Sequence, residues 1–170
     1  MWSVVNSKRL VMQRQESIER RALPPQRPRL ALAPSDSFGA EERRDGPARI
    51  LVVEDDFLVA MQVETALVEA GFDLVGIAAS AEDAIELATS QDPALVVMDI
   101  RLAGSRDGID AALELFRERG IRCIFATAHY DQETRTRAEP ASPLGWLKKP
   151  YTMVSLIETV RRALNELGRQ

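Results

Sequence analysis

The sequence predicts an α/β protein with a doubly wound, five-stranded parallel sheet and helices on both faces of that sheet. Three observations support this prediction. From Arg49 onward, short apolar runs alternate with stretches of helical periodicity. The runs are apolar on both faces, as parallel strands enclosed between two helical layers must be. Five such β/α units fit into about 120 residues, the size of one domain of this architecture.

The strands are expected at the five apolar runs, residues 50–53, 74–78, 95–98, 123–126 and 144–147. The first helix is expected at residues 57–70. Val63, Leu67 and Ala70 recur there at spacings of three and four residues, which places them on one buried face. Gly71 then ends the helix, because glycine readily adopts the left-handed conformation that closes a helical C-terminus.

The remaining helices are expected at residues 81–90, 108–119, 132–139 and 153–167. Ser80 is the expected N-cap of the second helix, with Asp83 at its third position. The fourth helix is polar, and Pro140 and Pro143 follow at its end. Because the residue before a proline disfavours helical geometry, this helix is expected to be short.

The first 48 residues differ in character from the rest of the chain. They hold five prolines, scattered arginines and little periodicity. Residues 1–48 are therefore expected to form a disordered N-terminal extension, and residues 49–168 the folded domain. An over-extended start would give the same pattern, and a basic tail that contacts a partner or a nucleic acid is the functional alternative.

The composition excludes several classes of function. Residues 49–170 hold 13 Lys and Arg against 20 Asp and Glu, which argues against direct nucleic-acid binding by the domain. The single cysteine, Cys123, excludes an intramolecular disulfide and a cysteine-cluster zinc site. No run approaches the roughly 20 apolar residues of a membrane span, and the start lacks the apolar core of a signal peptide. A cytoplasmic protein without membrane insertion is expected.

Side chains capable of chemistry follow four of the expected strands. In chain order they are Glu54-Asp55-Asp56, Asp99, Thr127 and Lys148-Lys149-Pro150. Ligands of doubly wound sheets bind beyond the carboxyl ends of the strands, so these side chains are expected to converge. Taken singly, each has a simpler explanation, as a helix cap for Asp55 or Asp56 or as a solvated lysine. Taken together, they predict an acidic site.

Such an acidic site needs positive charge, because carboxylates packed together repel one another. Mg²⁺ suits carboxylate, carbonyl and water oxygens, and a lysine adds a second positive charge. Cations around an accessible carboxylate are what phosphoryl transfer to that carboxylate requires. Asp99, at the end of the apolar run that forms the third strand, is the central candidate.

Four motifs in order carry a resemblance to a known family: ILVVEDD at residues 50–56, VVMDIRL at 96–102, FATAH at 125–129 and LKKPY at 147–151. Over about residues 49–167 the chain resembles the receiver domains of two-component response regulators. The resemblance implies a flavodoxin-like fold with Asp99 as phosphoacceptor. It also implies that Mg²⁺ is bound by Glu54, Asp55, Asp99 and the backbone carbonyl of Arg101.

The resemblance assigns roles to three more residues at the same rim. Thr127 would hydrogen-bond the phosphoryl group. Lys149, which directly precedes the proline, would pair with the phosphoryl group or the Asp99 carboxylate, and the Lys149–Pro150 peptide bond would be cis. Trp146 stands where the family often carries an aromatic switch residue, and a plain packing role for it is equally open.

The sequence departs from the family pattern around the phosphoacceptor. The loop after Asp99 is one residue longer than usual and has Ala103 in place of a proline. Arg101 and His129, two residues after Asp99 and Thr127, match positions that line the path of attacking water, so they are expected to tune dephosphorylation. An exposed loop residue is the alternative for His129. Residues 125–130 also share four of six positions with an alphaproteobacterial receiver subgroup of pattern F-A-T-G-hydrophobic-Y.

The resemblance implies a stand-alone receiver that catalyses only its own phosphorylation and autodephosphorylation, since only residues 168–170 follow the last expected helix. A histidine kinase or phosphotransfer protein would donate the phosphoryl group. A downstream protein would dock on the face of the fourth helix, fifth strand and fifth helix, or receive the phosphoryl group in a relay. A phosphorylation-independent adaptor or dimerisation module is the alternative, while a phosphohydrolase would need an aspartate where Arg101 stands.

Overall fold

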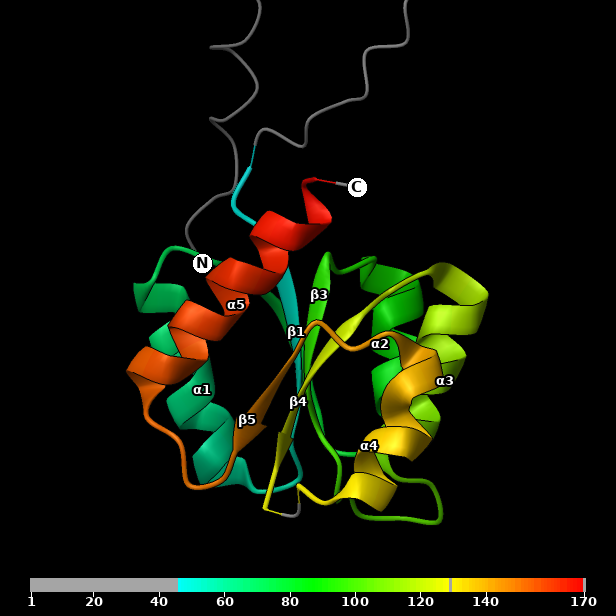
Figure 1. The fold of residues 1–170 in the computed structure, drawn as a ribbon. Coiled ribbons are helices and arrows are strands. Elements are labelled where there is room, and N and C mark those ends of the chain that lie inside the picture. Colours follow the sequence, from blue (N-terminus) through cyan, green and yellow to red (C-terminus); the bar gives the residue numbers. More distant parts are fainter. Residues whose placement is uncertain (1–45, 129, 170) are drawn as a thin grey trace, which may run out of the picture. The chain divides into compact units, whose positions relative to one another are not determined.

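Five parallel strands form one sheet in the order β2-β1-β3-β4-β5 in the computed structural model (Figure 1). The strands are β1 Arg49–Val53, β2 Asp73–Ala78, β3 Leu95–Asp99, β4 Cys123–Thr127 and β5 Gly145–Lys148. The structure describes residues 46–128 and 130–169, so the expectation for residues 1–48 lies almost entirely outside the described residues. The predicted fold class, a doubly wound five-stranded parallel sheet, is confirmed.

Helices cover both faces of the sheet, with α1 and α5 on one face and α2, α3 and α4 on the other (Figure 1). Their bounds are α1 Phe57–Glu69, α2 Ala81–Gln91, α3 Gly108–Arg119, α4 Gln132–Ala138 and α5 Met153–Leu167. A short 3-10 helix, η1 Glu139–Ala141, follows α4. The chain changes face between α1 and α2, which makes the carboxyl ends of β1 and β3 the topological switch point.

The two-sided burial of the strands explains their continuous apolar sequence. In β1, Leu51 and Val53 pack toward α2 and α3, while Ile50 and Val52 pack toward α1 and α5. Successive side chains of a strand point to opposite faces, so a strand between two helical layers needs apolar residues at every position. Cys123 follows the same rule: it is buried in β4, and burial raises the pKa of its thiol to about 12.

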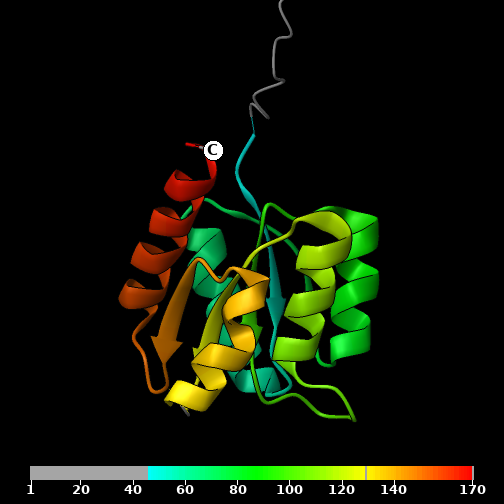
Figure 2. The same cartoon turned by 45° about the vertical axis from the view of Figure 1, so that its right-hand side comes forward.

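Helix α4 is short, as predicted, and it is held differently from the other helices. Its seven residues read QETRTRA, and Ala138 is its single buried residue. Pro140 lies in η1, where the α-helical hydrogen bonding of α4 is replaced by that of a 3-10 helix. In Figure 2, α4 lies between α3 and β5 on the outside of the sheet. Very few apolar contacts therefore hold α4 against the rest of the domain.

A glycine at the start of α3 sets the distance between that helix and the end of β3. The backbone N–H of Gly108 donates to the carbonyl oxygen of Ile100 at 2.9 Å. A Cβ at this position would overlap the carbonyl oxygen of Asp99 and press on the Met98 side chain. The close backbone approach therefore requires glycine.

We predict that Gly108→Ala lowers the free energy of unfolding by about 2–3 kcal/mol, because the added methyl group must push α3 away from the sheet. Urea unfolding measures the loss. Gly168→Ala is the matched control, since a Cβ there would meet its nearest neighbour, the Leu164 carbonyl, at an ordinary 3.6 Å. Equal stabilities of the two variants would contradict this explanation of the close approach.

Candidate functional site

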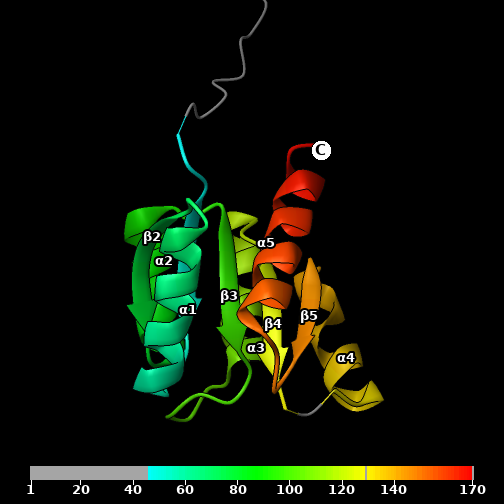
Figure 3. The ribbon, with the colours of Figure 1, turned by 90° about the vertical axis from the view of Figure 1, so that its left-hand side faces the viewer.

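The acidic and basic residues at the strand ends meet at one edge of the sheet, toward which all five strands run (Figure 3). Glu54 directly follows β1, Asp99 ends β3, Thr127 ends β4 and Lys149 directly follows β5. The parallel register aligns these ends: Val53 pairs with Met98, Asp99 with Ala126, and Thr127 with Lys148. The register therefore brings residues from four strands to the same level.

One ammonium group holds two buried carboxylates. The Nζ atom of Lys149 donates to Glu54 Oε2 and to Asp99 Oδ2, both at 2.6 Å. The side chains of Glu54 and Asp99 are only 5% and 9% exposed, and that of Lys149 is 24% exposed. Low exposure strengthens both ion pairs, because little water screens them. The neighbouring Lys148 is exposed on β5.

The pKa values in this cluster follow from burial and from the shared lysine. Burial raises the pKa of Glu54, and repulsion from Asp99 adds to this, against the opposing effect of Lys149. Burial alone would lower the pKa of Lys149, but its hydrogen bonds to Asp99 and Glu54 outweigh burial and raise it. The single positive charge of Lys149 therefore offsets the negative charges of Glu54 and Asp99 only in part.

A third carboxylate, that of Asp55, stands beside this pair. Glu54, Asp55 and Asp99 each offer a carboxylate oxygen, and these oxygens lie within 4.8 Å of one another. Three negative charges against the one positive charge of Lys149 leave an excess of two, which a single divalent cation would neutralise. This set of hard oxygen donors fits Mg²⁺. Asp56 is separate from the set, because its side chain caps α1 by accepting from Leu58 and Val59.

The loop after β3 begins with a contact to the central carboxylate. The backbone N–H of Arg101 donates to Asp99 Oδ1 at 3.1 Å, and the Arg101 side chain is exposed. Thr127 is 2% exposed and lies with Arg101 in the wall of a cleft of about 480 Å³ between this loop and α4. The Lys149–Pro150 peptide bond is cis. His129 lies outside the described residues.

Trp146 stands in a row of aromatic rings beside α4. Its ring centroid is 5.0 Å from that of Phe125, which is fully buried, and 5.2 Å from that of Tyr130, which is 42% exposed. The guanidinium of Arg135 stacks over Tyr130 at 5.2 Å. Trp146 therefore links the core to the α4 surface.

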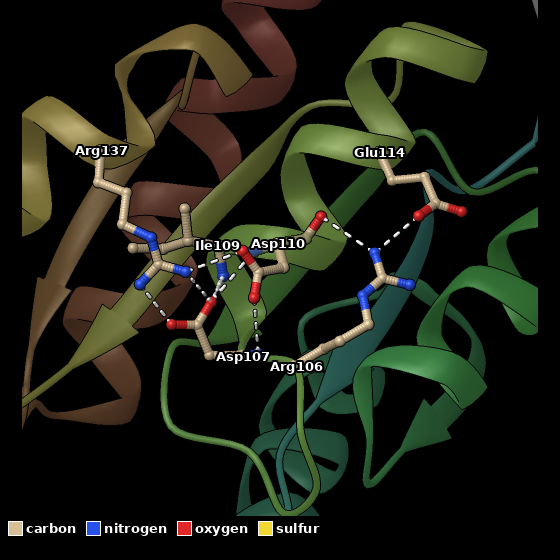
Figure 4. A network of polar contacts seen from close by, with 6 residues as sticks. All are labelled: Arg106, Asp107, Ile109, Asp110, Glu114 and Arg137. Atoms are coloured by element: carbon tan, nitrogen blue, oxygen red, sulfur yellow. Dashed lines mark hydrogen bonds and ion pairs between the residues drawn. The ribbon is translucent and has the colours of Figure 1, made fainter.

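A polar network near the site was not found by sequence reasoning. Figure 4 shows Arg137 of α4 directed at Asp107 and Asp110, which begin α3, and Arg106 directed at Glu114. The D-x-x-D spacing of Asp107 and Asp110 is a local pattern from which the N-cap of α3 could have been predicted. Arg137 lies 30 residues from Asp107 in the chain, and no local pattern relates them.

The fold is a doubly wound parallel sheet with an acidic cluster and a lysine at the carboxyl ends of its strands. Comparison with known proteins shows which family has this arrangement. Residues 50–161 match the family described as the response regulator receiver domain. The chain belongs to this family, the receiver domains of two-component systems.

Several curated relatives are similar over most of the described residues. The transcriptional regulatory protein PdtaR of Mycobacterium tuberculosis is 35% identical over 119 residues, 70% of this chain and 58% of PdtaR. The phyllosphere-induced regulator PhyR of Methylorubrum extorquens is 31% identical, over 76% of this chain and 48% of PhyR. The chain thus spans about half the length of these two relatives. The chemotaxis protein CheY of Bacillus subtilis is 30% identical, and 98% of its length is covered.

Solved structures agree with the fold. The signal receiver domain of a modulated diguanylate cyclase from Desulfovibrio desulfuricans G20 superposes with a TM-score of 0.67 at 30% identity, covering 72% of this chain and 97% of that one. The PhyR receiver domain of Erythrobacter litoralis gives 0.63 at 31% identity, covering 71% and 92%. The PhyR similarities are consistent with the subgroup resemblance of residues 125–130. Across the described residues, no helix is long and apolar enough to span a membrane.

We predict that Lys149→Met lowers the free energy of unfolding by about 2–3 kcal/mol at pH 7, because it leaves two buried carboxylates facing each other. The loss should shrink toward pH 4. The ordinary pKa of the Glu54 carboxyl is 4.5, and burial raises it in the folded protein. The folded state then binds more protons than the unfolded state. The free-energy cost of the buried charge therefore develops as pH rises from the unfolded pKa through the raised pKa.

Urea unfolding at pH 4 and pH 7 measures this pH dependence. Lys148→Met is the matched control: it removes the same charge from the adjacent residue and should leave both stabilities unchanged. If the two lysine variants lost the same stability at pH 7, or if the Lys149→Met loss were as large at pH 4, the bridging role of Lys149 would be refuted.

Proposed function

We propose that the chain acts as a response regulator whose Asp99 receives a phosphoryl group and whose phosphorylation governs docking to another protein. One observation carries this proposal: Lys149 pairs with Asp99 and Glu54 at 2.6 Å while Asp55 stands beside them. A purely structural domain gains nothing from mutually repelling buried acids. A group that accepts and holds a phosphoryl group needs this arrangement.

The proposed reaction is an in-line displacement. A carboxylate oxygen of Asp99 attacks the phosphorus atom of a phosphohistidine on a histidine kinase or phosphotransfer protein. The new O–P bond forms as the N–P bond breaks, and the released imidazole nitrogen takes a proton from water. The ammonium of Lys149 and the hydroxyl of Thr127 would donate hydrogen bonds to the transferred group. Water then attacks the phosphorus atom of the aspartyl phosphate, the O–P bond to Asp99 breaks, and inorganic phosphate and the Asp99 carboxylate are released.

Mg²⁺ is the proposed cation of this reaction, and Glu54, Asp55, Asp99 and the backbone carbonyl of Arg101 would hold it. When bound, it supplies positive charge that stabilises the equatorial phosphoryl oxygens. The protein residues orient Asp99: Arg101 donates its backbone N–H to Oδ1, and Lys149 donates to Oδ2. The two carboxylate oxygens are therefore fixed in direction before a phosphodonor arrives.

The proposed output surface is the face formed by α4, β5 and α5. Tyr130 and Trp146 lie in contact there, beside the polar surface of α4. Thr127 ends β4 only a few residues before α4 begins. A shift of Thr127 toward a phosphoryl group on Asp99 would therefore act directly on the start of α4. Two roles of Trp146 fit this output, a rotamer change together with Thr127 and plain packing.

We predict that incubation with acetyl phosphate and Mg²⁺ adds one phosphoryl group, measured by intact-mass spectrometry. Asp99→Asn should abolish the gain, because an amide lacks the nucleophilic oxygen. EDTA should reduce it at least about tenfold, since charge stabilisation by the cation is lost.

Asp56→Asn is the matched control for this experiment, because it neutralises a neighbouring acid that caps α1 and lies outside the site. This variant should be phosphorylated like the wild type. No gain of mass in the wild type would contradict the proposal and would favour a phosphorylation-independent adaptor that uses the same face.

We also predict that the Arg101→Ala, His129→Ala double variant loses its phosphoryl group about two- to fivefold faster, a barrier change of less than ~1 kcal/mol. Bulky side chains at these positions would obstruct the attacking water, and their removal would open its path. The half-life of the phosphorylated protein is measured after removal of acetyl phosphate, with Arg119→Ala as an exposed control. Equal half-lives would rule out this tuning role.

A further inference from the structure

A group of three charged side chains joins α4 to the beginning of α3 (Figure 4). Arg137, near the end of α4, donates to both carboxylate oxygens of Asp107, at 2.6 and 2.8 Å, and to Asp110 at 2.9 Å. We call Arg137, Asp107 and Asp110 the α3–α4 clamp. Two parallel hydrogen bonds from one guanidinium to one carboxylate give the ion pair a defined geometry as well as charge attraction.

The clamp matters for α4 because this helix has little else to hold it in place. The sequence QETRTRA contains no large apolar side chain, and Ala138 is its only buried residue. By contrast, α5 buries Leu156, Val160 and Ala163 against the sheet. A helix of seven residues is not stable by itself. The order and position of α4 therefore depend strongly on Arg137.

The other end of the clamp is fixed to the phosphoacceptor loop. Asp107 caps α3 by accepting from the N–H groups of Ile109 and Asp110. The next residue, Gly108, donates to the carbonyl oxygen of Ile100 and lies against the carbonyl oxygen of Asp99. The end of the loop that follows Asp99 is thus tied to its beginning. Movement of Asp107 must displace the loop that contains Arg101.

We propose that the α3–α4 clamp couples the position of α4 to the geometry of the loop after Asp99, with Arg137 as a positioning residue. Helix α4 is attached near its start to the segment after Thr127 and near its end to Asp107 through Arg137. The part of the proposal that concerns Mg²⁺ rests on the proposed function, in which this loop supplies the Arg101 carbonyl. By linkage, a protein that moves α4 changes Mg²⁺ affinity, and Mg²⁺ changes the affinity for that protein by the same factor.

The clamp is also expected to respond to salt. The side chains of Arg137, Asp107 and Asp110 are 45%, 30% and 41% exposed, so dissolved ions reach and screen them. Apolar contacts would not weaken in this way. Salt dependence confined to α4 and the loop would therefore separate the clamp from ordinary packing.

Arg137→Gln in the full-length chain tests the coupling by hydrogen exchange with mass spectrometry, at low salt and without Mg²⁺. Exchange should become about fivefold faster both in α4 and in residues 100–110, while the midpoint of urea unfolding changes little. In the wild type, 0.5 M NaCl should move both segments toward the variant, and it should change the variant little.

Arg117→Gln is the matched control, because it removes the same charge from an exposed arginine that pairs with its neighbour Glu118. It should exchange like the wild type. Unchanged exchange of α4 in Arg137→Gln would overturn the clamp, and faster exchange of α4 with an unchanged loop would overturn the coupling.

Mg²⁺ affinity, measured by calorimetric titration, provides the second readout and should fall about threefold in Arg137→Gln. An affinity equal to that of the wild type despite a loosened loop would overturn the link to the site. If the wild type itself did not bind Mg²⁺, the proposed function would fail, and the exchange measurement would still decide for or against the clamp.

Discussion

The repulsion between Glu54 and Asp99 is the constraint on which the rest of the site depends. Both carboxylates are buried at the ends of neighbouring strands, and both lie 2.6 Å from the same ammonium of Lys149. That ammonium comes from the end of β5, so the sheet must bring three strand ends to one level. With Asp55 beside them, positive charge is still in deficit. The acidic cluster at this edge of the sheet therefore suits a divalent cation.

The domain combines a rigid site with a loosely held helix. The strands that carry Glu54, Asp99 and Thr127 are packed between two apolar layers, and such interiors change little without large cost. Helix α4 instead depends on an exposed ion-pair group and one buried alanine. Elements that respond to a signal are drawn from the weakly held parts of a structure. In the proposed mechanism, charge changes at the strand ends are thus read out at α4, which buries only one residue.

The sequence predicted the fold and the meeting of Glu54, Asp99 and Lys149 at one edge of the sheet, because both depend on local patterns. Two-sided apolar strands fixed the layers, and in parallel sheets the residues after each strand meet at one edge. It could not choose between Asp55 and Asp56 as a helix cap, since only the backbone at the start of α1 shows that Asp56 accepts the N–H bonds. The contacts of Arg137 could not be predicted from local sequence patterns, because they join residues 27 and 30 positions apart.

In the proposed function, Asp99 itself carries the phosphoryl group. Borohydride reduces an aspartyl phosphate to homoserine, and peptide sequencing by mass spectrometry locates that residue in the chain. After treatment with acetyl phosphate and Mg²⁺, we expect homoserine at position 99 alone. Homoserine at position 55, 56 or 107, or none in a protein that had gained phosphoryl mass, would contradict it.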